Sequence, residues 1–219
     1  MIEIYHIQRE GDPYGGSRNS SKVLIALEEI GEKYSVKLLS RLQDCRPADA
    51  PYRKVNPNGV VPTINDGGFI LWESGAILRY LADSRASTTL MPTDAKQRAL
   101  VQQWLTWEGT TLNPSLLNLF FAMMAPTPDN DAIAAAKAAY LGNLGILDAQ
   151  LAGKEYVCSS FSIADIALGC IAPISFNLGL DLKPYPHLLA WVKRLGARPA
   201  WRKAETVVAD MAAGQAQLG

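Results

Sequence analysis

Residues 55–83 read VNPNGVVPTINDGGFILWESGAILRYLAD, and this stretch decides the fold of the first third of the chain. The apolar segment 61–64 predicts a strand, the Asp-Gly-Gly turn at 66–68 folds the chain back, and residues 69–72 predict the second arm of a hairpin. Glu-Ser-Gly at 73–75 then opens an amphipathic helix. The order places a loop carbonyl, a free peptide N–H and a helix N-terminus near one another. Such a corner suits the backbone and carboxylate of a small peptide.

The residues before this stretch predict a strand, a helix and a second strand. The first strand covers 2–7, the helix runs from about 19 to 30 with Gly31 as its C-cap, and the second strand covers 34–39. Residues 40–54 are polar and irregular. The order β-α-β followed by β-β-α predicts a small mixed sheet with helices packed against it, because the first pair needs a crossover and the second is a hairpin.

Everything after residue 92 predicts helix. Residues 84–92 have the composition of a linker, which gives predicted domains 1–83 and 93–219. Within the second domain a capping box is expected at Ser162 and Asp165. One buried helical stripe is indicated by apolar residues at three- and four-residue steps: Ile133, Ala136, Tyr140, Leu144, Leu147 and Leu151.

The composition excludes several classes of protein. Hydrophobic residues make up 48% of the 219 residues, and Lys plus Arg equals Asp plus Glu at 21 each, which argues against non-specific nucleic-acid binding. Three cysteines without CxxC spacing and two histidines argue against a disulfide framework and against a protein-built metal site. The charged N-terminus and the interrupted apolar stretch 161–180 indicate neither a signal peptide nor a membrane span. A cytoplasmic protein is therefore expected.

The segment 14–23, YGGSRNSSKV, joins the first strand to the first helix, where ligands usually bind in an open α/β sheet. A helix N-terminus stabilises an anion such as a thiolate, and a hydroxyl donating to the sulfur lowers the pKa of the thiol. Ser17 stands just ahead of the helix and fits either that role or a capping role. For Asn19, Ser20 and Ser21 the spacing favours capping.

Two further positions also have both a structural and a functional interpretation. Sequence alone favours a trans Pro62 at the start of an edge strand, whereas a cis bond would turn the Val61 N–H and C=O outward to pair with a peptide. Glu73 and Ser74 fit an ordinary helix start. They equally fit a site in which Ser74 holds a ligand carboxylate and Glu73 pairs with a ligand ammonium.

The chain resembles the cytosolic glutathione S-transferases, in particular serine-type or asparagine-type bacterial members. The matching segments span nearly the whole chain in the family's order: SRNSSKVLIALEE at 17–29, NPNGVVP at 56–62, WESGAILRYLAD at 72–83, FSIADIAL at 161–168 and YPHLLAWVKRLGARPAW at 185–201. The resemblance implies a thioredoxin-like N-terminal domain, an all-α C-terminal helical bundle and a homodimer. It also implies that the helical domain carries the electrophile site and part of the dimer interface.

The resemblance assigns roles to individual residues. Ser17 falls at the glutathione sulfur with Asn19 near it, and Val61 pairs with the cysteinyl backbone ahead of a cis Pro62. Glu73 and Ser74 hold the γ-glutamyl end. Arg41 and Lys54 are candidates for binding the glycyl carboxylate. Because the loop 8–16 is longer than is usual in the family, Tyr14, Ser20 and Ser21 stay open as alternative groups at the sulfur, and Tyr5 is a weaker one.

The expected activity is transfer of the glutathione thiolate to a small hydrophobic electrophile, in detoxification, with glutathione as co-substrate and no metal. Tyr14, Trp107, Thr110 and Asn113 are the predicted pocket residues, and helix-bundle core is the alternative interpretation of the last three. The alternatives to the transferase are a glutathione-dependent dehalogenase, ether-cleaving lyase, isomerase or reductase, and a non-catalytic binding module. Neither nucleic acid nor a membrane is an expected partner.

Overall fold

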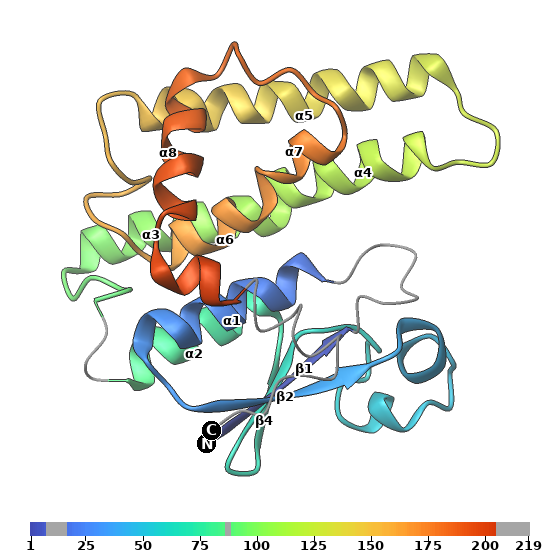
Figure 1. Cartoon of the computed structure of the whole chain (residues 1–219), viewed down its shortest axis with the longest axis vertical. Helices are drawn as coiled ribbons and strands as arrows, with labels where there is room; N and C mark the ends of the chain where they lie inside the picture. The colour runs from blue at the N-terminus through green and yellow to red at the C-terminus, as the bar shows by residue number, and fades with distance from the viewer. Residues whose placement is uncertain (8–16, 86–88, 205–219) are drawn as a thin grey trace. The chain divides into compact units, whose positions relative to one another are not determined.

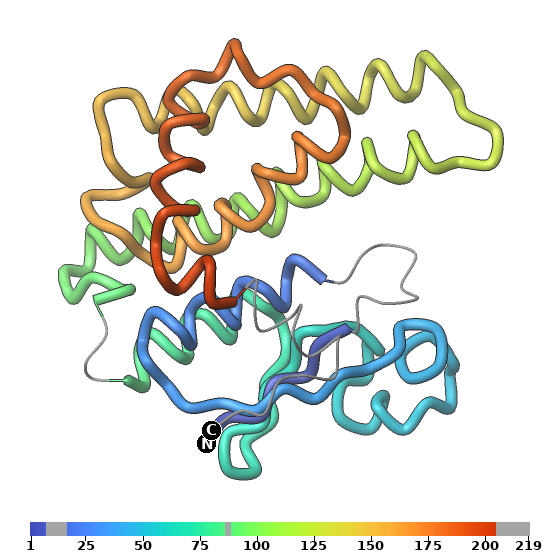
Figure 2. The backbone as a smooth tube through the Cα atoms, viewed as in Figure 1, coloured from blue at the N-terminus to red at the C-terminus, as the bar shows by residue number. Residues whose placement is uncertain are grey.

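The computed structural model describes residues 1–7, 17–85 and 89–204. Their contacts group the chain into two compact units, one formed by Met1–Thr88 together with Ala197–Gly219 and the other by Thr89–Gly196. Figures 1 and 2 trace the chain through both. No helix among the described residues is long and apolar enough to cross a membrane.

The first unit is built on a four-stranded sheet. Its strands are β1 (Ile2–Ile7), β2 (Tyr34–Leu39), β3 (Thr63–Asp66) and β4 (Phe69–Trp72), in the spatial order β2-β1-β3-β4. β1 and β2 run parallel, and the other neighbouring pairs are antiparallel. The helix α1 (Arg18–Ile30) supplies the crossover between the parallel pair (Figure 1). The predicted mixed sheet is confirmed.

Two helices cover one face of the sheet, and short helical turns cover the other. α1 and α2 (Ser74–Ser84) pack together on the first face (Figure 1). α1 ends at Gly31, whose φ of 73° suits glycine and whose N–H donates to carbonyls of the last turn, as predicted. Against the second face, η1 (Arg41–Cys45) and η2 (Pro51–Lys54) contribute to a buried cluster: Tyr5, Ile7, Leu39, Cys45, Tyr52 and Val61.

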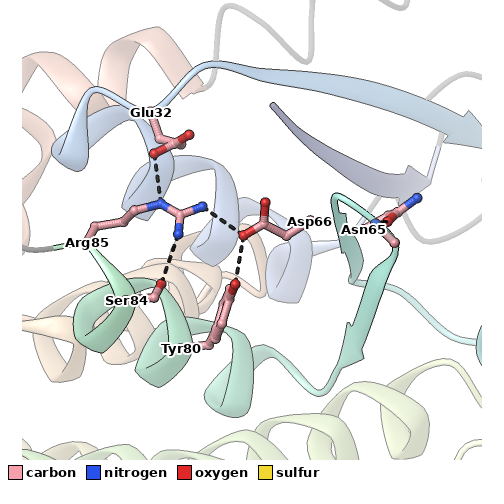
Figure 3. Close-up of polar contacts among 7 residues, drawn as sticks. Glu32, Asn65, Asp66, Tyr80, Ser84 and Arg85 are labelled. Atoms are coloured by element: carbon pink, nitrogen blue, oxygen red, sulfur yellow. Dashed lines mark hydrogen bonds and ion pairs between the residues drawn. The ribbon is translucent and has the colours of Figure 1, made fainter.

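An ion cluster closes the end of the sheet where β1 begins (Figure 3). Arg85 donates from Nε to Glu32 at 2.9 Å and from Nη2 to Asp66 at 2.8 Å, and the Tyr80 hydroxyl donates to the same Asp66 oxygen at 2.7 Å. The hydrogen bonds from Arg85 and Tyr80 hold the pKa of the Asp66 carboxyl below its usual value. Asp66 pairs with Ile2 in the β1–β3 register, so the cluster lies away from the end of β1.

The last described residues are tied to α1. The Arg198 guanidinium makes a two-pronged ion pair with Glu29, at 2.6 and 2.8 Å, and Lys203 pairs with Glu28 at 2.7 Å. Paired hydrogen bonds of this kind between a guanidinium and a carboxylate fix geometry as well as charge. Residues 197–204 therefore group with the sheet, whereas the predicted boundaries had placed them with the helices.

The second unit is helical throughout its elements, as predicted. It contains α3 (Ala95–Trp107), the π-helical turn η3 (Glu108–Leu112), α4 (Asn113–Met123), α5 (Asn130–Leu151), α6 (Ile163–Ile171), α7 (Ile174–Asn177) and α8 (Pro186–Gly196). The predicted stripe on α5 is buried over its last four positions, from Tyr140 to Leu151, and half-buried at Ile133 and Ala136. The predicted capping box of Ser162 and Asp165 opens α6.

Candidate functional site

The strand register brings two of the predicted site segments to the same end of the sheet. Thr63 pairs with Tyr5 on one side and with Trp72 on the other. The segment 61–62 comes just before Thr63, and 73–74 just after Trp72, so both lie where β1 approaches its end. α1 follows β1 in the chain and begins at that same end (Figure 1). Two helix N-termini and a loop therefore meet there.

The loop before β3 is held by a buried polar network. The Tyr52 hydroxyl lies 2.9 Å from the Val60 carbonyl and 2.7 Å from Thr63 Oγ1. Asn56 Nδ2 donates to the same Val60 carbonyl at 2.7 Å. Burial raises the pKa of Tyr52 to about 12, so its hydroxyl keeps its proton at neutral pH. The network fixes the Val60 carbonyl toward the protein.

The next residue, Val61, presents an unpaired stretch of backbone. Its side chain is buried in the cluster under the sheet, and the Val61-Pro62 peptide bond is cis. Within the described part of the chain, neither the N–H nor the C=O of Val61 makes a hydrogen bond. The interpretation of Pro62 as a trans residue opening an edge strand is wrong, because the bond is cis and β3 lies inside the sheet. Backbone groups of this kind can pair with an extended peptide.

The N-terminus of α2 has no side-chain cap. Glu73 occupies the N-cap position with φ 74° and ψ 114°, and its side chain accepts no capping bond. It is the one non-glycine residue with positive φ in the described ranges. Such a conformation costs about 1–3 kcal/mol, and residues that keep it cluster at binding sites. The first-turn N–H groups from Ser74 onward are therefore open to an anion.

The N-terminus of α1 is capped by Ser17. The Ser17 hydroxyl accepts a long hydrogen bond, 3.4 Å, from the N–H of Ser20. Capping by Asn19, Ser20 or Ser21 was the wrong expectation, because the helix begins at Arg18 and all three lie inside its first turn. Since a hydroxyl has one donor and two acceptor sites, the capping bond leaves the Ser17 O–H able to donate.

Of the two alternative hydroxyls in this turn, one has another partner, and the other is buried with no hydrogen-bond partner among the described residues. Ser21 Oγ donates to the Ser17 carbonyl at 3.2 Å, and Ser20 is fully buried. Asn19 is half-buried, and its Oδ1 accepts from Lys22 Nζ at 2.7 Å. Tyr14 lies outside the described residues. Of the predicted groups in this turn, Ser17 and Asn19 remain the best placed to meet a ligand.

The candidates for the glycyl carboxylate lie on the two short turns after β2. Arg41 opens η1 and is half-buried, and Lys54 ends η2 and is exposed. The neighbouring Arg53 has a structural role instead, because its guanidinium donates to the carbonyls of Pro47 and Pro57 at 2.9 and 3.1 Å. Both candidates stay predictions.

The predicted electrophile-pocket residues lie in the second unit. Trp107 is half-buried and packs edge-on against Trp104, with ring centroids 5.1 Å apart. Thr110 donates its hydroxyl to the Thr106 carbonyl at 2.9 Å, and Asn113 is the half-buried first residue of α4. Their contact with a substrate stays a prediction.

The cysteines offer no activated thiol. Cys45 and Cys170 are buried, and burial together with the nearby Asp165 raises the pKa of Cys158 to about 11. Among the residues that the structure describes, no group of three or more His, Cys, Asp or Glu side chains could hold a metal ion.

Comparison with known proteins gives the family to which this chain belongs. Family models for the glutathione S-transferase N-terminal and C-terminal domains match residues 16–84 and 112–199. The chain is 35% identical to glutathione S-transferase GstB of Escherichia coli (strain K12) over 193 residues, covering 85% of the chain and 92% of that protein. It is 32% identical to glutathione S-transferase F9 of Arabidopsis thaliana over 165 residues, covering 69% and 76%.

A solved structure agrees with these sequence matches. The theta class glutathione S-transferase of Xanthomonas axonopodis pv. citri, with glutathione bound, is 35% identical, with a TM-score of 0.79 and coverage of 93% of this chain and 96% of that one. The chain belongs to the glutathione S-transferase family. The predicted enzyme class and two-part fold are confirmed, and so, for the family, is glutathione as the co-substrate.

Proposed function

We propose that this chain binds glutathione at the end of the sheet where β1 finishes and transfers its thiolate to a small hydrophobic electrophile. The observation that carries the proposal is the unpaired backbone of Val61, which lies between two helix N-termini. The N-terminus of α1 is capped by the Ser17 hydroxyl, whose O–H can still donate, and the N-terminus of α2 has no side-chain cap. These three features match the cysteinyl backbone, the thiol and the γ-glutamyl end of glutathione. The expected cellular role is detoxification in the cytoplasm.

Each part of glutathione has a complementary group. The cysteinyl N–H and C=O pair with the C=O and N–H of Val61, as a neighbouring strand would. The γ-glutamyl carboxylate binds the hydroxyl and N–H of Ser74 at the helix N-terminus, and its ammonium pairs with Glu73. Lys54 or Arg41 binds the glycyl carboxylate.

The chemistry follows from the sulfur's position at α1. A free thiol has a pKa of about 8.5, so most of it is protonated at neutral pH. Donation from the Ser17 O–H, together with the partial positive charge of the helix N-terminus, favours the thiolate and lowers that pKa. The thiolate then forms a C–S bond to the electrophilic carbon as the leaving group departs with the bonding pair. The protein supplies no covalent nucleophile.

The acceptor and the assembly are further parts of the proposal. Trp107, Thr110 and Asn113 would line an apolar pocket with a few polar groups. A homodimer is supported by β4, an edge strand that carries the exposed apolar residues Phe69 (49%), Ile70 (38%) and Trp72 (37%). Exposed apolar edges of this kind are normally covered.

Calorimetry with glutathione, thiol titration of the complex and turnover of an aryl halide test this function. Ser17→Ala should raise the pKa of the bound thiol by about one unit and lower turnover about tenfold at neutral pH, through loss of one bond to a charged group. Asp94→Ala is the matched control, because Asp94 also caps a helix through a bond of 3.0 Å but stands at the start of α3. No heat with millimolar glutathione would refute the proposal. Binding without turnover of any electrophile would instead favour a binding module.

A further inference from the structure

Lys22 is the most unusual charged residue in the first unit. It lies on the second turn of α1 and exposes only 1% of its surface. Lysine is almost never fully buried unless its ammonium has a partner. One partner of Lys22 is the Asn19 side chain, whose Oδ1 lies 2.7 Å from Nζ. A buried lysine therefore binds the amide that stands beside the predicted sulfur site.

The chemistry of the pair decides which way the amide points. A side-chain amide carries an oxygen that accepts and a nitrogen that donates, whereas an ammonium only donates. The atom facing Lys22 must therefore be Oδ1, and Nδ2 must face the other way. In the described part of the chain Nδ2 donates to no other group. Asn19 is half-buried, so part of its side chain is accessible.

We propose that Lys22 is a positioning residue, which fixes the Asn19 amide so that its N–H donors stabilise the glutathione thiolate. This rests on the proposed function. An unanchored amide could rotate by half a turn and present its oxygen to the sulfur, which would repel the anion. The Lys22 bond excludes that orientation. Asn19 then adds a second donor to the one from Ser17.

The first test is Lys22→Met, which keeps a flexible apolar stem and removes the donor. The thiol pKa of bound glutathione should rise by about one unit and kcat at neutral pH should fall about tenfold, with little change in KM for glutathione. Above the raised pKa the rate should return toward that of the wild type. A purely structural role would not produce this pH profile. Lys33→Met is the matched control, since it removes one exposed lysine of the same unit.

The second test is a double-mutant cycle with Asn19→Ala. If Lys22 acts through Asn19, each single variant should raise the thiol pKa by a similar amount, and the double variant should raise it no further. Additive shifts would overturn the proposal, because Lys22 would then act on the sulfur independently. An unchanged thiol pKa in Lys22→Met would overturn it as well.

A third variant keeps the proposal testable if Lys22→Met does not fold. Asn19→Asp retains the partner of Lys22 as an ion pair but removes both N–H donors and adds a negative charge. It should raise the thiol pKa more than Asn19→Ala does, and an unchanged value would refute the proposal. Titration of the glutathione thiol in the wild-type complex distinguishes failure of the proposed function from failure of the Lys22 proposal. A wild type that does not lower the thiol pKa refutes the function itself, whereas a lowered pKa that these variants leave unchanged refutes only the role of Lys22.

Discussion

Helices α6 and α2 both begin with a serine and an acidic residue, but the two N-termini differ in what satisfies them. At α6, Asp165 Oδ1 accepts from the Val157 N–H and from Trp191 Nε1, both at 2.9 Å. Its Oδ2 accepts from the N–H and the hydroxyl of Ser162, at 3.0 and 3.2 Å. At α2, Glu73 precedes Ser74 and caps nothing.

The difference lies in the order of the two residues. A carboxylate three positions after the serine reaches back and accepts hydrogen bonds from the N–H groups at the start of its own helix. An acid immediately before the serine leaves the first-turn N–H groups open and places its own charge beside them. The first arrangement stabilises a domain, and in the proposed function the second binds a ligand that carries both a carboxylate and an ammonium.

Asp165→Asn should produce the largest effect on folding. The amide that replaces the carboxylate has one accepting end, so its NH₂ group must face donors on one side, and burial prevents water from compensating. We expect a loss of about 3 kcal/mol in the free energy of unfolding, measured by urea denaturation. Asp131→Asn, in the exposed first turn of α5, should change it by less than about 0.5 kcal/mol. A loss of that small size at Asp165 would contradict the view that its four bonds hold the helix end.

Ser74→Ala should show the opposite pattern, with a large effect on binding and a small one on folding. The Ser74 hydroxyl makes no capping bond in the structure, so its removal should change the free energy of unfolding by less than about 0.5 kcal/mol. Loss of a hydrogen bond to the ligand carboxylate should raise the Kd for glutathione about tenfold to a hundredfold. Calorimetry on the same samples measures this value. An unchanged Kd together with a large loss of stability would make α2 an ordinary structural helix.

The sequence predicted the elements of both regions because their signals are local. The turn at 66–68, the glycine after α1 and the spacing of Ser162 and Asp165 each act within one turn of chain, where residue type and position decide the geometry. The segments 61–62 and 73–74 of the proposed site were predicted for the same reason. These two segments lie at the same end of the sheet because they flank a hairpin, and the turn fixes the register of its two strands.

The errors and omissions have a different physical cause. The prediction of the capping residue of α1 was wrong because that residue depends on where the helix starts after a long connection. The network of Tyr52, Asn56 and Thr63 was missed because it joins residues up to 11 positions apart through the path of η2. Lys22 was overlooked as one of several charged residues on α1, and the sequence did not show that it is the buried one. Its spacing of three from Asn19 was the available signal.

Glu73 allows the conformational and chemical parts of the open helix end to be separated. Glu73→Ala and Glu73→Gly both remove the carboxylate, so both should weaken glutathione binding by a similar factor of about three to ten. At φ 74° a β-carbon is disfavoured, so the glycine variant should be more stable than the alanine variant by about 1 kcal/mol. Thermal unfolding measures the difference between them. Equal stability would mean that the backbone there carries no strain.

The smallest effect is expected at Asp66, near the far end of α2, where Arg85 and Tyr80 satisfy the carboxylate. Because its folded-state pKa is lowered, the stabilisation is present above the unfolded value of 3.8 and is lost as the pH falls through the lower folded value. Asp66→Asn should therefore cost about 1 kcal/mol at pH 7, and the difference from wild type should shrink in acid below about pH 4. Urea denaturation across this pH range measures the difference in the free energy of unfolding.

The Kd for glutathione should stay at the wild-type value in Asp66→Asn, since Asp66 pairs with Ile2 at the opposite end of the sheet from the proposed site. A loss of affinity as large as that of Ser74→Ala would mean that the two ends of α2 are energetically coupled, and that an uncapped N-terminus alone does not define the binding site.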